Sequence, residues 1–290
     1  MMVNVLSAIV AYLTCPVCGA DLTLGRGSVS CANNHSFDVA RQGYINLLPG
    51  GAHAGTADTA AMVEARAAFV AEGHFASFAA LLADHVAAAT GPSFGLESGS
   101  PLIVDAGAGT GYHLTAALGR CPSAVGMAID ISKFAARRAA RAHPQIGAVV
   151  ADLWGRLPVR SGAASAILNV FAPRNPGEFR RILRPDGSLL VVSPTARHLR
   201  EVVRPLQLLS VDDDKTRQVD SVLGDLFDLV DRTEHETGLL LPHLAVEALV
   251  RMGPSSRHHS SADIRDRVAG LADPVPVTAS FTLSIYRPTG

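Results

Sequence analysis

The sequence predicts an α/β protein in which a small metal-binding domain precedes a Rossmann-like, mainly parallel sheet. Two observations support this fold class. Between residues 102 and 194, short apolar segments alternate with segments of helical periodicity, which is typical of a parallel sheet covered by helices on both faces. Three of the four cysteines lie within the first 31 residues, and this clustering favours a metal site over a disulfide framework.

Composition limits the class of protein. The 290 residues are 48% hydrophobic and 18% charged, which provides enough apolar surface for a packed core and excludes a disordered or collagen-like chain. The opening segment MMVNVLSAIVAYL lacks the basic start of a signal peptide and is too short to span a membrane. We therefore expect a cytoplasmic protein with no membrane partner.

Charge is distributed unevenly along the chain. The formal net charge is −1, yet residues 120–217 carry 16 Lys and Arg side chains against 8 Asp and Glu. Nearly all of these cations are arginines, which bind phosphate bidentately and stack on bases, so the stretch favours a nucleic-acid partner. A GC-rich coding sequence and solvated helix faces explain the same enrichment equally well, and composition alone does not separate the two explanations.

The chain divides into three predicted parts. Residues 1–48 are rich in Cys, Gly and Asn and form the metal-binding domain. Residues 49–99 combine a linker with helices that lead into the larger domain, and the linker, Pro49 to Thr59, is expected to be mobile or wrapped on the surface. Residues 100–290 form the larger α/β domain.

Apolar periodicity places the elements of the larger domain. The expected strands are Leu102–Ala106, Val125–Asp130, Ala148–Asp152, Ala164–Ala172 and Ser188–Pro194, with helices between them over 113–120, 132–143 and 177–184. Ahead of these strands, the spacing from Ala60 to Thr90 predicts two helices that break near Glu72 and Gly73. The tail from Ala279 to Pro288 is expected to add an antiparallel strand at the sheet edge.

The first candidate site is a zinc knuckle. Cys15 and Cys18 are separated by two residues, and Cys31 and His35 by three. Such paired spacing points four ligands at one tetrahedral centre, so we expect a structural zinc ion with a filled coordination shell. The alternative is a set of buried or redox-active thiols with His35 as an ordinary loop histidine.

The second candidate site is a glycine-rich turn that follows the first strand of the sheet. Gly107, Gly109 and Gly111 occupy alternate positions between the strand and the next helix, where a backbone can turn sharply beneath a nucleoside cofactor. The third glycine comes one residue earlier than in the dinucleotide pattern G-x-G-x-x-G. This spacing favours S-adenosylmethionine over NAD.

Three aspartates at successive strand ends support a donor site. Asp130 is predicted to accept the ribose hydroxyls, Asp152 to accept the adenine amino group, and Asp105 to order the glycine loop and face the methionine ammonium. Each aspartate alone is more often a helix cap or turn former. Their occurrence together beside a glycine loop favours the donor site.

The acceptor is expected beside the end of the fourth strand. Asn169 and His113 are the candidates for a catalytic role and for further donor contacts, although His113 could merely cap its helix. Phe171 could stack on a base, and a core aromatic is an equal alternative. Arg174 and Arg197 are predicted to contact RNA phosphates.

Several motifs together resemble the RlmA family of 23S rRNA (guanine-N(1))-methyltransferases. They are Cys15-Pro-x-Cys18, Cys31, His35-x-Phe37-Asp38, Gly43-Tyr44-x-Asn46-Leu47-Leu48, Asp105 to Gly111, Asp130-x-Ser132-Lys133, Asn169-Val-Phe-Ala-Pro173, Leu183-Arg-Pro-Asp-Gly187 and Arg251-Met-Gly-Pro254. The segments NVFAPRNP and MGPSS are similar to the Gram-positive, type II branch, which includes the tylosin-resistance enzyme of macrolide producers. Gly253 departs from the threonine of many members, which leaves the role of that turn open.

The resemblance implies more than the residues do alone. It implies a class I S-adenosylmethionine-dependent methyltransferase domain, a zinc domain that helps to hold 23S rRNA, a homodimer, and a target guanine in hairpin 35 near the macrolide tunnel. Macrolide resistance and housekeeping modification are alternative physiological roles. Two other functions compete: a small-molecule methyltransferase, and a zinc-ribbon RNA-binding protein without catalytic activity.

Overall fold

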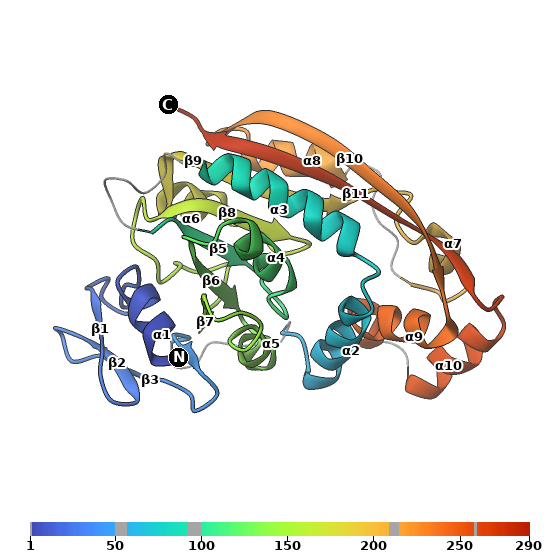
Figure 1. Ribbon diagram of the computed structural model, residues 1–290, viewed down its shortest axis with the longest axis horizontal. Helices are drawn as coiled ribbons and strands as arrows, with labels where there is room; N and C mark the ends of the chain where they lie inside the picture. The colour runs from blue at the N-terminus through green and yellow to red at the C-terminus, as the bar shows by residue number, and fades with distance from the viewer. Residues whose placement is uncertain (1, 50–56, 92–99, 209–214, 258–259) are drawn as a thin grey trace.

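The computed structural model describes residues 2–49, 57–91, 100–208, 215–257 and 260–290, and within these ranges the chain forms two sheets (Figure 1). Most of the predicted linker, residues 50–56, lies outside the described residues. The helices are α1 (Met2–Val10), α2 (Ala60–Ala71), α3 (Ala76–Thr90), α4 (Tyr112–Arg120), α5 (Lys133–Ala139), α6 (Pro176–Ile182), α7 (Arg200–Val203), α8 (Lys215–Leu223), α9 (His243–Arg251), the 3-10 turn η1 (Pro254–Arg257) and α10 (Ser261–Ala269). The strands are β1 (Leu22–Leu24), β2 (Ser28–Cys31), β3 (Ser36–Asp38), β4 (Tyr44–Asn46), β5 (Leu102–Ala106), β6 (Val125–Asp130), β7 (Ile146–Val150), β8 (Ala164–Val170), β9 (Leu183–Pro194), β10 (Phe227–Leu241) and β11 (Val275–Pro288).

The predicted doubly wound sheet is confirmed. Its eight strands follow the order β10-β11-β9-β8-β5-β6-β7-β4, and every neighbouring pair from β9 to β4 is parallel. Counted from β5 as the first strand, five of them give the order 3-2-1-4-5, whose switch point beside the first strand is where α/β proteins bind ligands. The tail strand β11 is antiparallel to β9, as predicted, but β10 and not β11 forms the edge.

Three of the five predicted strands have wrong boundaries. The third strand covers Ile146–Val150 instead of Ala148–Asp152, the fourth ends at Val170 instead of Ala172, and the fifth begins at Leu183 instead of Ser188. The fifth strand therefore includes the last two residues of the helix that was predicted over 177–184. In the third and fourth strands, the strand ends with the buried apolar run. Asp152 therefore lies on the loop beyond β7 and does not close that strand.

The two faces of the sheet are covered by different helices. Side chains of α3, α4, α5, α9 and α10 share one core with the sheet, and those of α1, α6 and α8 share the other. Figure 1 shows α3 lying along the strands. The predicted break near Glu72 and Gly73 is confirmed between α2 and α3, where Gly73 has a φ of +79° that favours glycine. Among the described residues, we find no helix with the length and apolar character needed to span a bilayer.

The N-terminal residues are joined to the large sheet. β1, β2 and β3 form a separate antiparallel sheet, but β4 pairs in parallel with β7 at the edge of the large sheet. The sequence reasoning missed both β4 and α1. Ile9 of α1 is fully buried, and a Cβ atom on Gly147 of β7 would lie 2.5 Å from its Cδ1 atom. α1 therefore sits on β7 at a point where the strand has no side chain.

The contact between Ile9 and Gly147 predicts size complementarity between α1 and the sheet. Ile9→Ala should lower the free energy of unfolding by about 2–5 kcal/mol because it leaves a cavity, and Gly147→Ala by about 1–3 kcal/mol because it overpacks the contact. In the double variant the new methyl group occupies part of the vacated space. Urea unfolding of all four proteins should give a loss smaller than the sum of the two single losses, and additive losses would contradict this packing.

Candidate functional site

The four predicted metal ligands converge at one point. The ligand atoms of Cys15, Cys18, Cys31 and His35 all lie within 4.8 Å of one another. The Sγ atoms of Cys18 and Cys31 are 3.7 Å apart, and His35 Nδ1 lies 3.6 Å from Cys15 Sγ and 3.5 Å from Cys31 Sγ. Tetrahedral zinc with its usual bond lengths places two sulfurs about 3.8 Å apart and a sulfur and a nitrogen about 3.6 Å apart. The donor set and its spacing therefore fit zinc.

Local backbone geometry favours the thiolate at the outer edge of this metal site. Cys15 and Cys31 are buried, whereas Cys18 is exposed. A hydrogen bond from the backbone of Ala20 is the main reason that the pKa of the Cys18 thiol falls to about 6. Burial raises the pKa of the Cys15 thiol. With three cysteines and one histidine as ligands, no coordination position remains for a reactant, so the site is structural.

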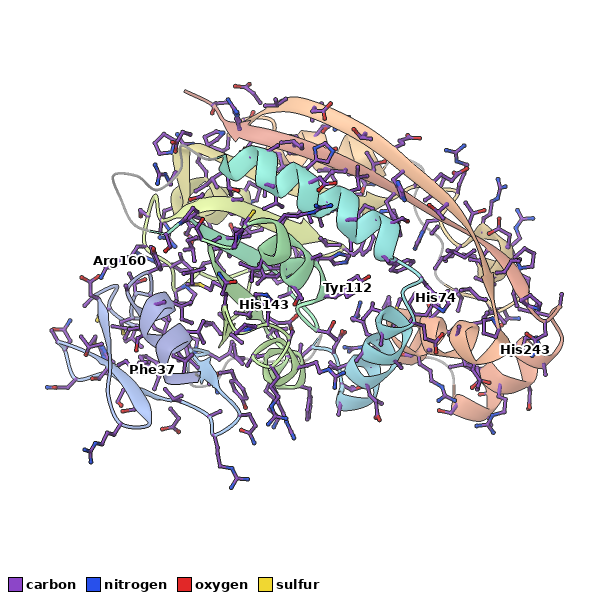
Figure 2. All side chains as sticks on the ribbon, viewed as in Figure 1. Phe37, His74, Tyr112, His143, Arg160 and His243 are labelled. Atoms are coloured by element: carbon purple, nitrogen blue, oxygen red, sulfur yellow. The ribbon has the colours of Figure 1, made fainter. Side chains whose placement is uncertain are left out.

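The zinc ribbon, residues 13–48, and Tyr12 just before it are hydrogen-bonded to the loop that follows β7. The backbone N–H of Thr14 donates to the carbonyl of Pro158 over 3.1 Å, and the N–H of Arg160 donates to the carbonyl of Tyr12 over 2.9 Å. Arg160 lies beside the ribbon in Figure 2, and its Nη2 atom is 3.0 Å from Asp21 Oδ1. The ribbon therefore keeps a fixed position relative to the carboxyl end of β7.

The glycine loop adopts the predicted sharp turn. Gly107, Gly109 and Gly111 have φ values of +89°, +52° and +78°, a region that favours glycine. A Cβ atom on Gly107 would lie 2.3 Å from Ala172 Cβ, and one on Gly111 would lie 3.2 Å from Ala139 of α5. The first and third glycines thus permit close packing within the protein. Gly109 instead faces a side chain that the sequence reasoning did not consider.

That side chain is Arg66 of α2. A Cβ atom on Gly109 would lie 3.5 Å from Arg66 Cδ, so the arginine covers the loop. Its Nη2 atom donates to Asp58 Oδ2 over 2.8 Å and to the carbonyl of Met252 over 2.9 Å, while its buried Nε atom has no hydrogen-bond partner among the described residues. No glycine or strand pattern indicates Arg66, because it reaches the loop from a helix more than 40 residues earlier in the chain.

Asp130 lies against the glycine loop as predicted. Its Oδ2 atom accepts the Gly109 N–H over 2.8 Å, and its Oδ1 atom accepts the Ser132 N–H over 2.8 Å. Burial raises the pKa of this carboxyl group, and the two amide hydrogen bonds act against that increase. Each carboxylate oxygen keeps a further lone pair, so Asp130 can still accept a hydroxyl of a bound nucleoside.

The other two aspartates occupy different surroundings. Asp105 is buried, and burial together with the nearby Asp130 carboxylate raises its pKa to about 7. Its Oδ1 atom has no hydrogen-bond partner among the described residues, so it is an unoccupied acceptor behind the loop. Asp152 accepts the backbone N–H of Trp154 over 3.0 Å and forms a turn beyond β7.

Asn169 connects the glycine loop, which is the predicted donor loop, to the segment that follows β8. Its Nδ2 atom donates to the carbonyl of Ala106 over 3.1 Å and to the carbonyl of Pro173 over 2.9 Å. The side chain is fully buried, and its Oδ1 atom has no partner among the described residues. Phe171 has a φ of +54° and is 42% exposed. A bulky residue in this conformation is strained, and the turn holds its ring at the surface instead of in the core.

Two histidines near these residues are neutral at pH 7. Burial, together with Arg66, lowers the pKa of His113 to about 4. Burial also lowers the pKa of His198 to about 4. The ring of His198 lies 6.2 Å from that of Phe171 and 4.7 Å from that of Phe281. The sequence reasoning missed His198, which no motif indicates.

The arginines predicted to contact RNA already have partners within the protein. Arg174 donates to Ser193 Oγ over 3.0 Å, and burial lowers its pKa. Arg197 forms ion pairs with Glu234 at 3.5 Å and with Glu236 at 2.9 Å. Other cations of the basic stretch are more accessible: Arg137, Arg138 and Arg141 on and beside α5 are exposed and form no ion pair within the described part of the chain.

One family model and several known proteins are similar in sequence to this chain. The family described as RlmA, N-terminal, a zinc ribbon, matches residues 13–53. A protein of Micromonospora griseorubida, provisionally named 23S rRNA (guanine-N(1)-)-methyltransferase, is 50% identical over 289 residues, which cover 96% of this chain and 97% of that protein. The 23S rRNA (guanine(748)-N(1))-methyltransferase of Streptomyces fradiae is 46% identical over 281 residues, which cover 97% of this chain and 98% of that protein.

The geometry of the metal site predicts the effect of losing one ligand. Cys31→Ser should abolish stoichiometric zinc binding and loosen residues 13–48, because the metal supplies much of the folding free energy of so small a unit. Metal analysis and limited proteolysis measure these two effects. Cys121→Ser is the matched control, since Cys121 is a buried thiol beside Thr90 and not part of the cluster. Full zinc content in the Cys31→Ser variant would contradict the assignment.

Proposed function

The chain belongs to the RlmA family of 23S rRNA (guanine-N(1))-methyltransferases, and from this premise we propose that it transfers a methyl group from S-adenosylmethionine to N(1) of a guanine in 23S rRNA. The observation that carries the proposal is the turn in which Gly109 and Asp130 are hydrogen-bonded beside the switch point of the sheet. By analogy with the Streptomyces fradiae relative, we propose the guanine equivalent to position 748 as the target.

Residues around the glycine loop are assigned to the donor. Asp130 would accept the ribose hydroxyls, and Asp152, on the loop after β7, would accept the adenine amino group. Asp105 would face the ammonium of the methionine portion, and Arg66, with its unpartnered buried Nε atom, would face the carboxylate. When bound, S-adenosylmethionine supplies a methyl group activated by a sulfonium centre. Neither Asp105 Oδ1 nor Arg66 Nε has a hydrogen-bond partner among the described residues. The first atom can accept from the ammonium of an amino acid, and the second can donate to its carboxylate.

The acceptor base is assigned to the segment after β8. Phe171 holds an exposed ring beside Asn169, which is tied to the donor loop at Ala106. A guanine stacked on Phe171 would therefore lie next to the donor site. Asn169 cannot take up a proton, and His113 with a pKa of about 4 is a weak base, so we assign both to positioning. Correct alignment of two reactants can supply on the order of 7–11 kcal/mol of rate acceleration.

Several features support an RNA acceptor over a small molecule. The zinc ribbon occupies a fixed position beside the loop after β7, and exposed arginines lie on α5. Both provide contact surface beyond the reacting atoms. A zinc-ribbon protein without catalytic activity would not need the turn geometry of Gly109 and Asp130. The phosphate contacts of Arg174 and Arg197 stay predictions, and both side chains would have to exchange their present partners.

Other properties of the family extend this proposal. From the resemblance to the RlmA family, we propose that the chain forms a homodimer in the cytoplasm and that its target lies in hairpin 35. We also propose a role in tylosin-type macrolide resistance. A housekeeping modification would use the same chemistry. Light scattering measures the oligomeric state. The macrolide susceptibility of a deletion strain separates a role in resistance from a housekeeping modification.

Methyl transfer to 23S rRNA is the direct test of function. Purified protein with labelled S-adenosylmethionine and a 23S rRNA transcript should label one guanine, which primer extension locates because N(1) methylation blocks base pairing. Asp130→Asn should weaken donor binding about 10- to 100-fold, since it removes a charged hydrogen-bond acceptor. Label on a small molecule, or donor binding with no transfer, would support one of the competing functions.

The buried Asp105 carboxyl predicts a pH-dependent donor affinity. Its pKa of about 7 means that the group is largely neutral in the free protein at pH 5.5. A bound ammonium favours the charged carboxylate, so binding below pH 7 must release a proton, and affinity should rise with pH by up to about tenfold per unit. His113, with a pKa of about 4, does not titrate in this range.

Titration calorimetry with S-adenosylhomocysteine, which carries the same ammonium, measures this dependence between pH 5.5 and 7. Buffers of different ionisation enthalpy count the released protons. Asp105→Asn should bind more weakly at pH 7 and lose most of the pH dependence. An equally steep dependence in that variant would assign the titration to another group.

A further inference from the structure

The loop after β7 exposes an aromatic side chain that the proposed function does not use. Trp154 is the only tryptophan of the chain and is 68% exposed. It is followed by Gly155 and Arg156, which are also exposed, while Leu153 and Leu157 on either side are buried. Tryptophan is highly buried on average because of its large apolar surface. The exposed tip, residues 154–156, is therefore anchored at both ends.

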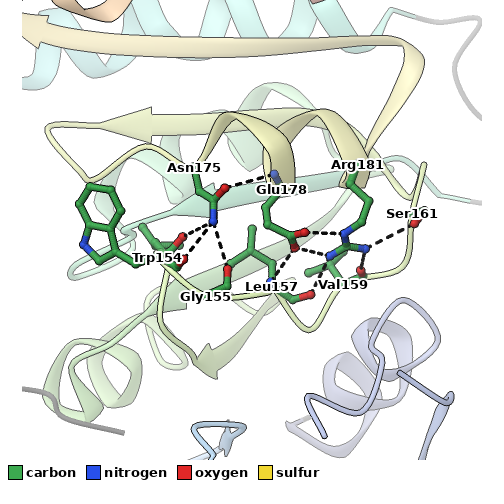
Figure 3. Close-up of polar contacts among 9 residues, drawn as sticks. Trp154, Gly155, Leu157, Val159, Ser161, Asn175, Glu178 and Arg181 are labelled. Carbon is green, nitrogen blue, oxygen red and sulfur yellow. Dashed lines mark hydrogen bonds and ion pairs between the residues drawn. The ribbon is translucent and has the colours of Figure 1, made fainter. Parts of the chain in front are cut away.

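Side chains of α6 and of its N-cap residue, Asn175, hold the backbone of this tip in one conformation (Figure 3). Asn175 Nδ2 donates to the carbonyls of Leu153, Trp154 and Gly155 over 3.1, 3.3 and 3.1 Å. Glu178 Oε2 accepts the Leu157 N–H over 2.7 Å. A rigid aromatic anchor loses little conformational entropy when it binds a partner.

Arg181 completes the support. It is paired with Glu178 at 2.5 Å and donates to the carbonyls of Leu157 over 2.8 Å and Val159 over 2.7 Å. Both partners of this ion pair are more than three-quarters buried. The network continues to the segment that binds the zinc ribbon, because Thr14 donates to Pro158 within the same stretch.

The tip lies between the zinc ribbon and the donor loop. Arg156 Nη2 would lie 3.7 Å from a Cβ atom on Gly19, which follows the metal ligand Cys18. Among the described residues, Arg156 forms no ion pair within 4.0 Å, although its charge is one of the causes that lower the pKa of Glu178. On the other side, Leu153 Cδ1 would lie 3.6 Å from a Cβ atom on Gly107 of the donor loop.

We propose that Trp154 stacks on an unpaired base of the RNA substrate, next to the target guanine, while Arg156 binds an adjacent phosphate. The proposal rests on the proposed function, because it places a second base beside the one that is methylated. An exposed indole and an exposed guanidinium on one rigid tip match the two chemical parts of a single-stranded nucleotide, an aromatic ring and an anion. The zinc ribbon and the donor loop fix the tip relative to the reacting base.

The single tryptophan provides a direct test, because the fluorescence of the wild-type protein reports on Trp154 alone. The probes are a 23S rRNA hairpin transcript with the guanine equivalent to position 748, the same transcript fully paired to its complement, and S-adenosylhomocysteine. The hairpin should quench the fluorescence saturably, and the duplex should not. Quenching by S-adenosylhomocysteine alone would place the indole against the donor and overturn the proposal.

Variants separate stacking from charge. Trp154→Ala should weaken hairpin binding about 10-fold with an unchanged salt dependence, because stacking releases no counterions. Trp154→Phe should stay within about 3-fold of wild type. Arg156→Ala should reduce the slope of log affinity against log salt by about 1. Leu240→Ala is the matched control, since Leu240 is equally exposed, at 68%, but lies on β10.

The outcomes distinguish this inference from the proposed function. Zinc content and affinity for S-adenosylhomocysteine should stay unchanged in Trp154→Ala, which shows that the variant is folded. If that folded variant binds the hairpin as tightly as wild type, the stacking site is wrong, even though wild-type protein still methylates the RNA. If wild-type protein methylates no RNA, the proposed function itself fails.

Discussion

The packing of the glycine loop between β5 and α4 is the constraint on which the rest of the site depends. β5 is buried along its whole length, so the chain must turn sharply at its end and place its amide groups against polar partners. Ala172 fills the space beside Gly107, and Asp130 accepts the N–H of Gly109. Asn169 then ties the beginning of the loop to the segment after β8. One turn therefore fixes both the residues proposed to bind the donor and those proposed to hold the acceptor, and a side chain on Gly107 would separate them.

The N-terminal region extends this same framework. β4 continues the parallel sheet beyond β7, and α1 covers the strand at Gly147. The metal holds β1, β2 and β3 in a sheet of only three short strands, which could bury little apolar surface by itself. Because Thr14 and Arg160 join the ribbon to the loop after β7, the metal also affects the position of residues far from its ligands. The ribbon is thus a structural part of the catalytic half and not only an attachment to it.

Sequence reasoning identified the features that depend on local pattern. The strands around the donor site, the break at Gly73 and the four metal ligands all follow from apolar periodicity or from fixed spacing, and the structure contains each of them. Features that depend on long-range packing were missed. α1 carries an apolar segment that periodicity alone could not assign, and Arg66 reaches the donor loop only through the position of α2. The partner of Arg174 also depends on packing, because its place near a strand end did not indicate that it would donate to Ser193.

Substrate choice must lie outside the donor site. The glycine turn and the aspartates are the proposed binding site of the methyl donor, and the same arrangement can serve acceptors of many kinds. Outside that turn, the chain exposes residues 154–156, with Arg156 beside Gly19 of the metal ribbon, and the strained ring of Phe171. The hydrogen bonds of Asn175, Glu178 and Arg181 hold residues 153–159 in place without contacting the glycine turn. Exposed contacts on a rigid backbone suit a polymer, because each added contact selects a larger folded substrate while the chemistry at the donor stays the same.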